Sequence, residues 1–134
     1  MLIEWDKSLS VGIDKIDSDH QKLLNIINDF GSDDDKSREE LTALINDLVD
    51  YSRYHFDREE DLMAANGYVN LEKHQEEHGI FIAKLLELGI MLETEDLDTT
   101  RNEAGQFLSM WLTRHIRMSD MDYVSCVVSG GGTA

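Results

Sequence analysis

The chain contains no proline and only one cysteine, Cys126, in its 134 residues. Without proline, no position forces a helix to kink or break, so long uninterrupted helices are allowed. A single thiol cannot form an internal disulfide, and it cannot supply the thiolate set that structural zinc sites use. Because disulfides belong to oxidising compartments, their absence suits a reducing one, and we expect the protein to be cytoplasmic.

Basic residues are also scarce. The chain has 12 lysines and arginines against 28 aspartates and glutamates, which gives a net charge of -16. Such a surface repels nucleic acid and anionic lipid headgroups, so we expect no nucleic-acid partner and no membrane partner. No apolar run approaches the roughly 20 residues that a membrane-spanning helix needs. The first residues lack the basic start and apolar stretch of a secretory signal. We expect one soluble domain and a monomer.

Four segments of the chain have apolar residues at helical spacing behind a polar capping residue. Three of the starts have the form of a capping box, in which Ser or Thr is followed three residues later by Gln or Glu. Gly31 is placed to end the first helix, and Asn66-Gly67 the second. The helices are expected to run from Ser18 to Gly31, from Ser37 to Asn66, from Asn70 to Asp96, and from Thr100 past Met118.

Four amphipathic helices with short connections predict an all-α fold, an antiparallel up-down-up-down four-helix bundle. We expect residues 1–17 to form an extended N-terminal arm, residues 18–128 the bundle, and residues 129–134 a flexible tail. Apolar residues of the arm should pack on the bundle, with a short edge strand as the less favoured alternative. These residues are Trp5, Leu9, Val11 and Ile13.

The five histidines all fall on the apolar stripes of these helices. They are His20, His55, His74, His78 and His115. If a core-facing stripe takes three of every seven positions, five random placements would all land on it about 1–2% of the time. A buried imidazole without a partner costs roughly 1–3 kcal/mol, and the stripes offer few hydroxyls or amides. A metal would satisfy one nitrogen of each ring at once.

Two carboxylates join the histidines. Glu59 follows His55 by four residues among apolar neighbours, and Asp120 follows His115 by five. Seven donors are too many for one tetrahedral zinc, while calcium and magnesium prefer oxygen ligands. Five imidazoles with two carboxylates suit a pair of first-row transition ions, iron above all. The i and i+4 spacing of His74 and His78 would direct both rings to one metal.

The spacing of His115 and Asp120 does not fit a regular helix. Residues five apart on an ideal α-helix differ by about 140° around the axis, so they cannot share a face. We expect a π-bulge between them, because the extra residue of a π-turn restores the alignment. The alternative is a frayed helix end from which Asp120 reaches back.

The order and spacing of these residues resemble those of the hemerythrins, most closely the single-domain bacterial members. The resemblance covers about residues 5 to 123, and one departure is Val69, where bacterial members often carry proline after Gly-Tyr. The matching residues are Val11-Gly12-Ile13, Ile16-Asp17, His20, His55-Phe56, Glu59-Glu60, Met63, Gly67-Tyr68, His74, His78, Phe81, Trp111-Leu112, His115-Ile116, Asp120 and Tyr123.

The resemblance implies a non-haem di-iron centre. His74, His78 and His115 would bind one iron, and His20 and His55 the other. Glu59 and Asp120 would bridge the two ions beside an oxo or hydroxo group. The iron with two histidines would be one ligand short, and O2 would bind there. A dry wall around the O2 pocket is expected from Leu23, Leu24, Phe56, Trp111, Leu112 and Ile116.

The function that the resemblance implies is reversible O2 binding, for storage, delivery or scavenging. The alternatives are a di-iron peroxidase or ferroxidase, and a domain that senses O2 or redox state. Oxygen-activating bundles are usually carboxylate-rich, with four glutamates and two Glu-x-x-His motifs. The seven donors here are nitrogen-rich and include no Glu-x-x-His, which favours O2 binding over an enzyme.

Overall fold

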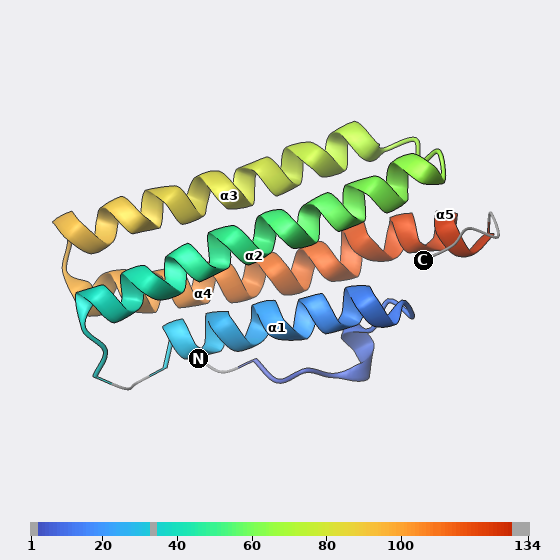
Figure 1. Ribbon diagram of the computed structural model, residues 1–134. Coiled ribbons are helices and arrows are strands. Elements are labelled where there is room, and N and C mark those ends of the chain that lie inside the picture. Colours follow the sequence, from blue (N-terminus) through green and yellow to red (C-terminus); the bar gives the residue numbers. More distant parts are fainter. Residues whose placement is uncertain (1–2, 33–34, 130–134) are drawn as a thin grey trace.

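The computed structural model describes residues 3–32 and 35–129 of the chain. Four long helices lie side by side in an up-down-up-down bundle, which confirms the predicted all-α fold (Figure 1). No strand occurs in the described ranges. The helices are α1 (Asp14–Phe30), α2 (Arg38–Ala65), α3 (Leu71–Thr94) and α4 (Leu97–His115).

The fourth helix continues beyond α4. A five-residue π-helix, η2 (Ile116–Asp120), joins α4 to a final helix, α5 (Met121–Ser129). Ser129, which was assigned to the flexible tail, therefore belongs to α5. The rest of the predicted tail, residues 130–134, lies outside the described residues.

The core consists of the apolar stripes read from the sequence. Each helix turns a row of Leu, Ile, Phe or Met side chains towards the bundle axis, where they are almost completely buried. Burying one such side chain contributes roughly 1.5–3 kcal/mol, so this shared interior holds the four helices together. Examples from α1 to α4 are Leu23, Ile27, Phe30, Leu48, Met63, Phe81, Leu85, Leu88 and Leu108.

The N-terminal arm packs on the bundle as expected. Leu9, Val11 and Ile13 are buried, and Trp5 is partly buried against the core. Instead of an edge strand the arm forms one short 3-10 helix, η1 (Lys7–Leu9). Apolar contact with the bundle is therefore what fixes the arm.

The expected start of the first helix was wrong. Helix α1 begins at Asp14, four residues before Ser18, which is an exposed residue inside the helix and caps nothing. The side chain of Asp17 accepts hydrogen bonds from the Ser10 hydroxyl (2.6 Å) and the Val11 backbone N–H (2.8 Å). These bonds tie the arm to the first turn, so tertiary contacts extend the helix beyond the residues that the capping pattern predicts.

The second helix starts at the predicted capping box. Ser37 Oγ accepts from the backbone N–H of Glu40, and a Glu40 carboxylate oxygen accepts from the backbone N–H of Ser37, both at 3.1 Å. Gly31 is the C-cap of α1, as expected. Asn70 stands at the N-cap of α3, but its side chain makes no capping hydrogen bond.

The capping box predicted at Thr100 was also wrong. Helix α4 begins at Leu97, because the Asp96 carboxylate accepts from the backbone N–H of Thr99 at 3.0 Å. Thr100 is buried in the first turn. The acidic residues expected to end α3 therefore also start α4, which makes the connection between the two helices very short.

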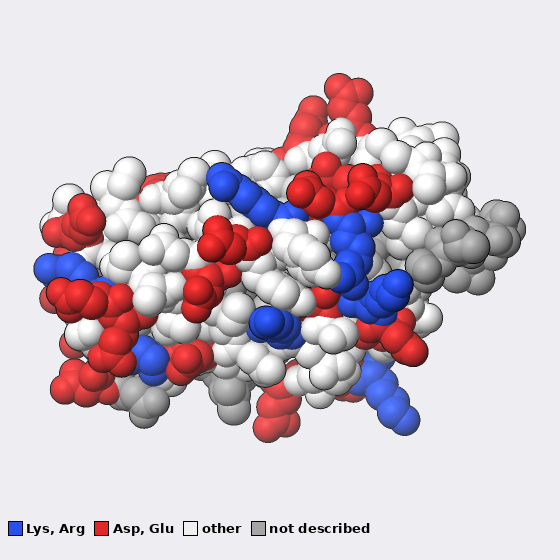
Figure 2. Space-filling model, in the orientation of Figure 1, with Lys and Arg blue, Asp and Glu red and all other residues white. Residues whose placement is uncertain are grey.

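Acidic side chains are spread along the face of the bundle that Figure 2 shows. None of the helices in residues 3–32 and 35–129 has an apolar stretch that could span a lipid bilayer. Each helix turns an apolar stripe to the core, and α3 also exposes three apolar side chains, Ile80, Leu86 and Ile90.

Candidate metal centre

All seven predicted donors lie in the interior of the bundle. None of these side chains is more than 5% exposed. Each long helix contributes at least one donor, because each apolar stripe carries a histidine among the core residues. The donors are His20 on α1, His55 and Glu59 on α2, His74 and His78 on α3, His115 at the end of α4, and Asp120 at the end of η2.

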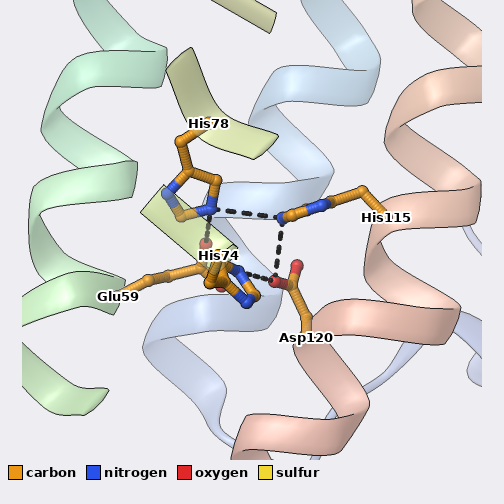
Figure 3. Close-up of side chains that lie close together, drawn as sticks. All are labelled: Glu59, His74, His78, His115 and Asp120. Carbon is orange, nitrogen blue, oxygen red and sulfur yellow. Dashed lines mark hydrogen bonds and ion pairs between the residues drawn. The ribbon is translucent and has the colours of Figure 1, made fainter. Parts of the chain in front are cut away.

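Three histidines and two carboxylates form one group (Figure 3). Their donor atoms all lie within 4.8 Å of one another. Nε2 of His74 and Nε2 of His115 lie 3.0 and 3.2 Å from Oδ1 of Asp120. Nε2 of His78 lies 3.3 Å from Oε1 of Glu59 and 3.2 Å from Nε2 of His115.

The other two histidines form a second group with the same carboxylates. Nε2 of His20 lies 3.0 Å from Oδ2 of Asp120, and Nε2 of His55 lies 3.2 Å from Oε1 of Glu59. Asp120 thus turns one oxygen to each group. Two overlapping donor sets that share two carboxylates can hold two metal ions side by side, with the carboxylates between them.

The buried polar atoms that lack hydrogen-bond partners also fit metal binding at this site. Six buried donor or acceptor atoms of the cluster make no hydrogen bond of normal geometry. They are Nδ1 and Nε2 of His20, Nε2 of His74, Oε1 of Glu59, and Oδ1 and Oδ2 of Asp120. Orphaned polar atoms in a dry core are strongly unfavourable unless a metal or another partner takes them. With metal–nitrogen bonds of about 2.0–2.1 Å, ligands at right angles would stand about 3 Å apart, close to the spacings found here.

The π-helix aligns the last two donors. Residue Met121 donates its backbone N–H to the carbonyl of Ile116, five residues earlier, in place of the usual four. This wider turn brings Asp120 and His115 to the same face, so that both reach the cluster. The expected π-bulge is confirmed, and the frayed alternative is wrong.

Carboxylates hold the outer edges of three of the rings. Nδ1 of His55 lies 2.9 Å from Asp19, Nδ1 of His78 lies 2.8 Å from Glu60, and Nδ1 of His115 lies 3.0 Å from Glu77. Such partners fix the orientation of a ring and direct its Nε2 inward.

Sequence reasoning did not find these three partners. Asp19 and Glu60 each adjoin a donor in the sequence, next to His20 and Glu59, and Glu77 adjoins His78. Each of these carboxylates nevertheless pairs with a histidine of a different helix. With 28 acidic residues in the chain, adjacency alone could not select them.

Hydroxyl groups orient the carboxylates in turn. The Tyr51 hydroxyl donates to Asp19 at 2.8 Å, the Tyr123 hydroxyl to Glu59 at 2.7 Å, and the Ser119 hydroxyl to Glu77 at 2.6 Å. Burial and the neighbouring Asp19 raise the pKa of Tyr51 to about 12, and burial with Glu59 and Asp120 raises the pKa of Tyr123 further. Both phenols therefore stay neutral and act as hydrogen-bond donors.

The cluster without metal is held by opposite charges. Burial lowers the pKa of His55, but Glu59, Asp19 and Asp120 outweigh it and raise the value to about 10. Burial and the nearby Asp120 raise the pKa of Glu59, but His55 and His78 outweigh them and bring it to about 2. Burial also raises the pKa of Asp120, but His115, His20 and His74 outweigh it and lower the value. Both carboxylates are therefore ionised at neutral pH, as metal ligands must be.

The six residues expected to line an O2 pocket are placed as follows. Five are almost fully buried: Leu23, Leu24, Phe56, Leu112 and Ile116. Trp111 is half-buried. The Phe56 ring stacks on His78 with centroids 3.8 Å apart, and Trp111 stacks on His115 at 4.5 Å. The two aromatic residues thus pack on rings of the three-histidine group.

Comparisons with known proteins point to one family. A family model described as "Hemerythrin HHE cation binding domain" matches residues 11–127. The chain is 33% identical over 128 residues to a bacteriohemerythrin from Clostridium acetobutylicum, covering 90% of this chain and 97% of that protein. It is 34% identical over 119 residues to a hemerythrin-like protein from Naegleria gruberi, covering 89% and 88%.

A solved structure has the same fold. A crystal structure of wild-type hemerythrin aligns with a TM-score of 0.81, at 24% sequence identity. The alignment covers 95% of this chain and 98% of that chain. At this level of identity the likeness concerns the arrangement of the helices.

Proposed function

Since this chain belongs to the hemerythrin family, we propose that it binds O2 reversibly at two iron ions in the core of the bundle. His74, His78 and His115 would hold one iron, and His20 and His55 would hold the other. Glu59 and Asp120, which belong to both donor groups, would supply ligands to both ions. The physiological use is storage, delivery or scavenging of O2.

One observation carries this proposal. The two overlapping donor groups share both carboxylates, but one contains three histidines and the other contains two. An ion in the three-histidine group would therefore have one protein ligand more than an ion in the two-histidine group. An ion held by His20 and His55 would have one protein ligand fewer, and O2 would bind at that position.

Iron held by these seven residues would supply the electrons for reversible O2 binding. The protein must keep this exchange free of water and stray protons. Leu23, Leu24, Leu112 and Ile116, all almost fully buried, provide apolar side chains within a turn or so of the donors. The carboxylates on the outer ring nitrogens keep the imidazoles in place through the cycle.

The donor chemistry supports a carrier more than an enzyme. Five neutral imidazoles and two carboxylates leave the ferrous pair with little excess charge in the core, and neutral nitrogen ligands stabilise Fe2+. Carboxylate-rich bundle sites are the ones that usually activate oxygen. A peroxidase or ferroxidase, and an O2 or redox sensor, are the competing functions that the experiment below separates.

The test is an O2 titration of the iron-loaded protein after anaerobic reduction, followed by absorption in the near-ultraviolet and visible range. We expect bands that appear with O2 and bleach when O2 is removed, over repeated cycles. Rapid irreversible conversion to the ferric form with peroxide turnover would support the enzyme and contradict the carrier.

Variants connect the spectrum to the site. His55→Ala removes one of the two rings of the ligand-poor ion and should abolish the reversible bands. Met110→Leu, an exposed change on α4, should leave them unaltered. Equal spectra for the two variants would contradict the assignment of His55.

Two further expectations remain predictions. The single cysteine, Cys126, suits a cytoplasmic location, and the highly charged surface suits a monomer.

A further inference from the structure

A surface pocket of about 370 Å³ opens directly above one histidine of the site. A smaller pocket of about 80 Å³ shares four of its residues and reaches His74, so the two form one depression. The larger pocket is lined by Lys73, Glu77, Trp111, Arg114, His115, Met118 and Ser119.

Aromatic contact joins this pocket to the site. His115 is the most exposed of the five histidines, at 5%. The half-buried indole of Trp111 stacks on its ring, with centroids 4.5 Å apart and an angle of 12° between the planes. Because no donor is more than 5% exposed, the stack of Trp111 on His115 offers an electron a route from the surface to a metal ligand.

Two cations stand at the pocket without a partner. Neither Lys73 nor Arg114 makes a hydrogen bond or an ion pair with the part of the chain that the structure describes. Both carboxylates that line the depression are already engaged. Glu77 accepts from the Ser119 hydroxyl and holds Nδ1 of His115. Asp122, in the smaller pocket, accepts from the Tyr68 hydroxyl. In a chain with net charge -16, two unpaired cations beside an indole form a local site for an anion that carries an aromatic ring.

We propose that this pocket binds a small anionic electron donor of the reduced flavin mononucleotide class, which returns the oxidised iron pair to the ferrous state. The proposal rests on the proposed function, because it assumes iron at the site. The phosphate lies against Lys73 and Arg114. The flavin ring lies against the exposed edge of the Trp111 indole, which is half-buried and stacks on both His115 and Phe81. The pocket volume falls in the range of about 300–1,000 Å³ that small-molecule sites occupy.

The chemistry balances with no further reactant. A reduced flavin gives up two electrons, one after the other, and two protons, and becomes oxidised flavin. The electrons convert two Fe3+ to two Fe2+ by way of Trp111 and His115. The protons leave to solvent through the open pocket. A small donor fits better than an acidic redox protein, which the overall charge of the chain would repel.

Binding is tested with oxidised flavin mononucleotide as the probe and the iron-loaded protein, by quenching of flavin fluorescence. The double variant Lys73→Gln/Arg114→Gln should bind at least tenfold more weakly than the unaltered chain. The matched control Lys7→Gln/Arg53→Gln removes two exposed cations elsewhere and should bind within twofold. Equal affinity for all three proteins overturns the proposal.

Electron transfer is tested by anaerobic stopped-flow reduction of the ferric protein. Reduced flavin mononucleotide should react at least fivefold faster than reduced riboflavin, which lacks the phosphate, and Lys73→Gln/Arg114→Gln should remove that difference. Trp111→Leu should weaken binding of the oxidised probe and, even at saturating reduced flavin, slow the reduction, because it removes both the contact with the flavin ring and the route to His115. Equal rates for the two flavins overturn the proposal.

The two proposals can fail separately. O2 titration of protein reduced with dithionite does not involve the pocket. If the O2 bands are irreversible while the charge-dependent flavin binding persists, the proposed function fails alone. If the bands are reversible and flavin binding is absent, only the pocket assignment fails.

Discussion

Asp19 shows how much a single residue outside the ligand set can decide. It is buried, accepts from the Tyr51 hydroxyl, and holds Nδ1 of His55. Arg58 adds a more distant charge, with its Nε 3.6 Å from the Asp19 carboxylate. Hydrogen bonds and the positive charges lower the pKa of Asp19, even though burial by itself raises it. The carboxylate therefore stays ionised and fixes the His55 ring with Nε2 turned inward.

Replacing this carboxylate should weaken metal binding without removing a ligand. In Asp19→Asn the neutral amide would hold the His55 ring less firmly and lower its basicity. We expect an affinity for iron about 10–100-fold lower, measured by competition with a chelator of known affinity.

The matched control is Asp61→Asn, the same chemical change at an exposed position on α2. It should leave the affinity unaltered. If both variants bound iron like the unaltered chain, Asp19 would not be a positioning residue for the site.

At the scale of the element, the π-helix η2 matters most. It inserts one extra residue between α4 and α5 and thereby puts His115 and Asp120 on one face. Met118 in this segment is 69% exposed, so its side chain contributes little to packing. The π-helix keeps Asp120 on the core-facing side of the helix, because a regular α-helix through these five residues would turn it away from the core.

Deleting Met118 should therefore be tolerated. The segment would close into a regular α-helix, His115 and Asp120 would then be four residues apart, and both would still face the cluster. We expect a folded protein that binds two iron ions, measured by metal analysis and circular dichroism.

Deleting Met110 provides the contrast, because it is a similarly exposed methionine, 61% accessible, within regular α4. That deletion rotates all later residues by about 100° around the helix and should abolish iron binding. Equal iron content in the two deletion variants would contradict the account of η2 as a register device.

Helix caps can be tested at the same scale. Ser37 makes both bonds of a capping box with Glu40, whereas Ser18 lies inside α1 and caps nothing. Ser37→Ala should lower the free energy of unfolding by about 1 kcal/mol, measured by denaturant titration. Ser18→Ala should change it by only a few tenths at most, since alanine is the better helix former. A similar loss of unfolding free energy in both variants would contradict the conclusion that Ser37 caps a helix and Ser18 does not.

For the whole molecule, the core is a compromise between packing and chemistry. Two buried carboxylates and five buried histidines occupy positions where apolar side chains would pack without unpaired polar atoms. Charge pairing between these groups stabilises the metal-free cluster in part, but the orphaned atoms of His20 and Asp120 remain unsatisfied. The surface adds a net charge of -16, whose self-repulsion also opposes compaction.

Removing iron should thus lower the stability of the whole bundle. A metal that binds only the folded state stabilises it by about 4 kcal/mol when its free concentration is a thousand times its dissociation constant. We expect a clearly lower melting temperature after anaerobic chelation, measured by scanning calorimetry, and recovery when Fe2+ is restored. An unchanged melting temperature would contradict the coupling between the metal and the fold.

The sequence by itself determined the helices, the bundle and the set of seven donors. Four helices with apolar stripes and short connections bury those stripes best as an antiparallel bundle. The stripes also carry all five histidines: His20, His55, His74, His78 and His115. The need for a π-turn before Asp120 also followed from helix geometry alone, because an angular mismatch on a helix is a local property.

Only the tertiary structure decided which acids support the donors. Asp19 pairs with His55 and Glu77 with His115 across 36 and 38 residues of sequence, and no local pattern encodes such a pair. The start of α1 at Asp14 also depended on the arm that Asp17 holds. Contacts between distant segments depend on how the helices rotate and slide against one another, and packing of the complete core fixes those positions.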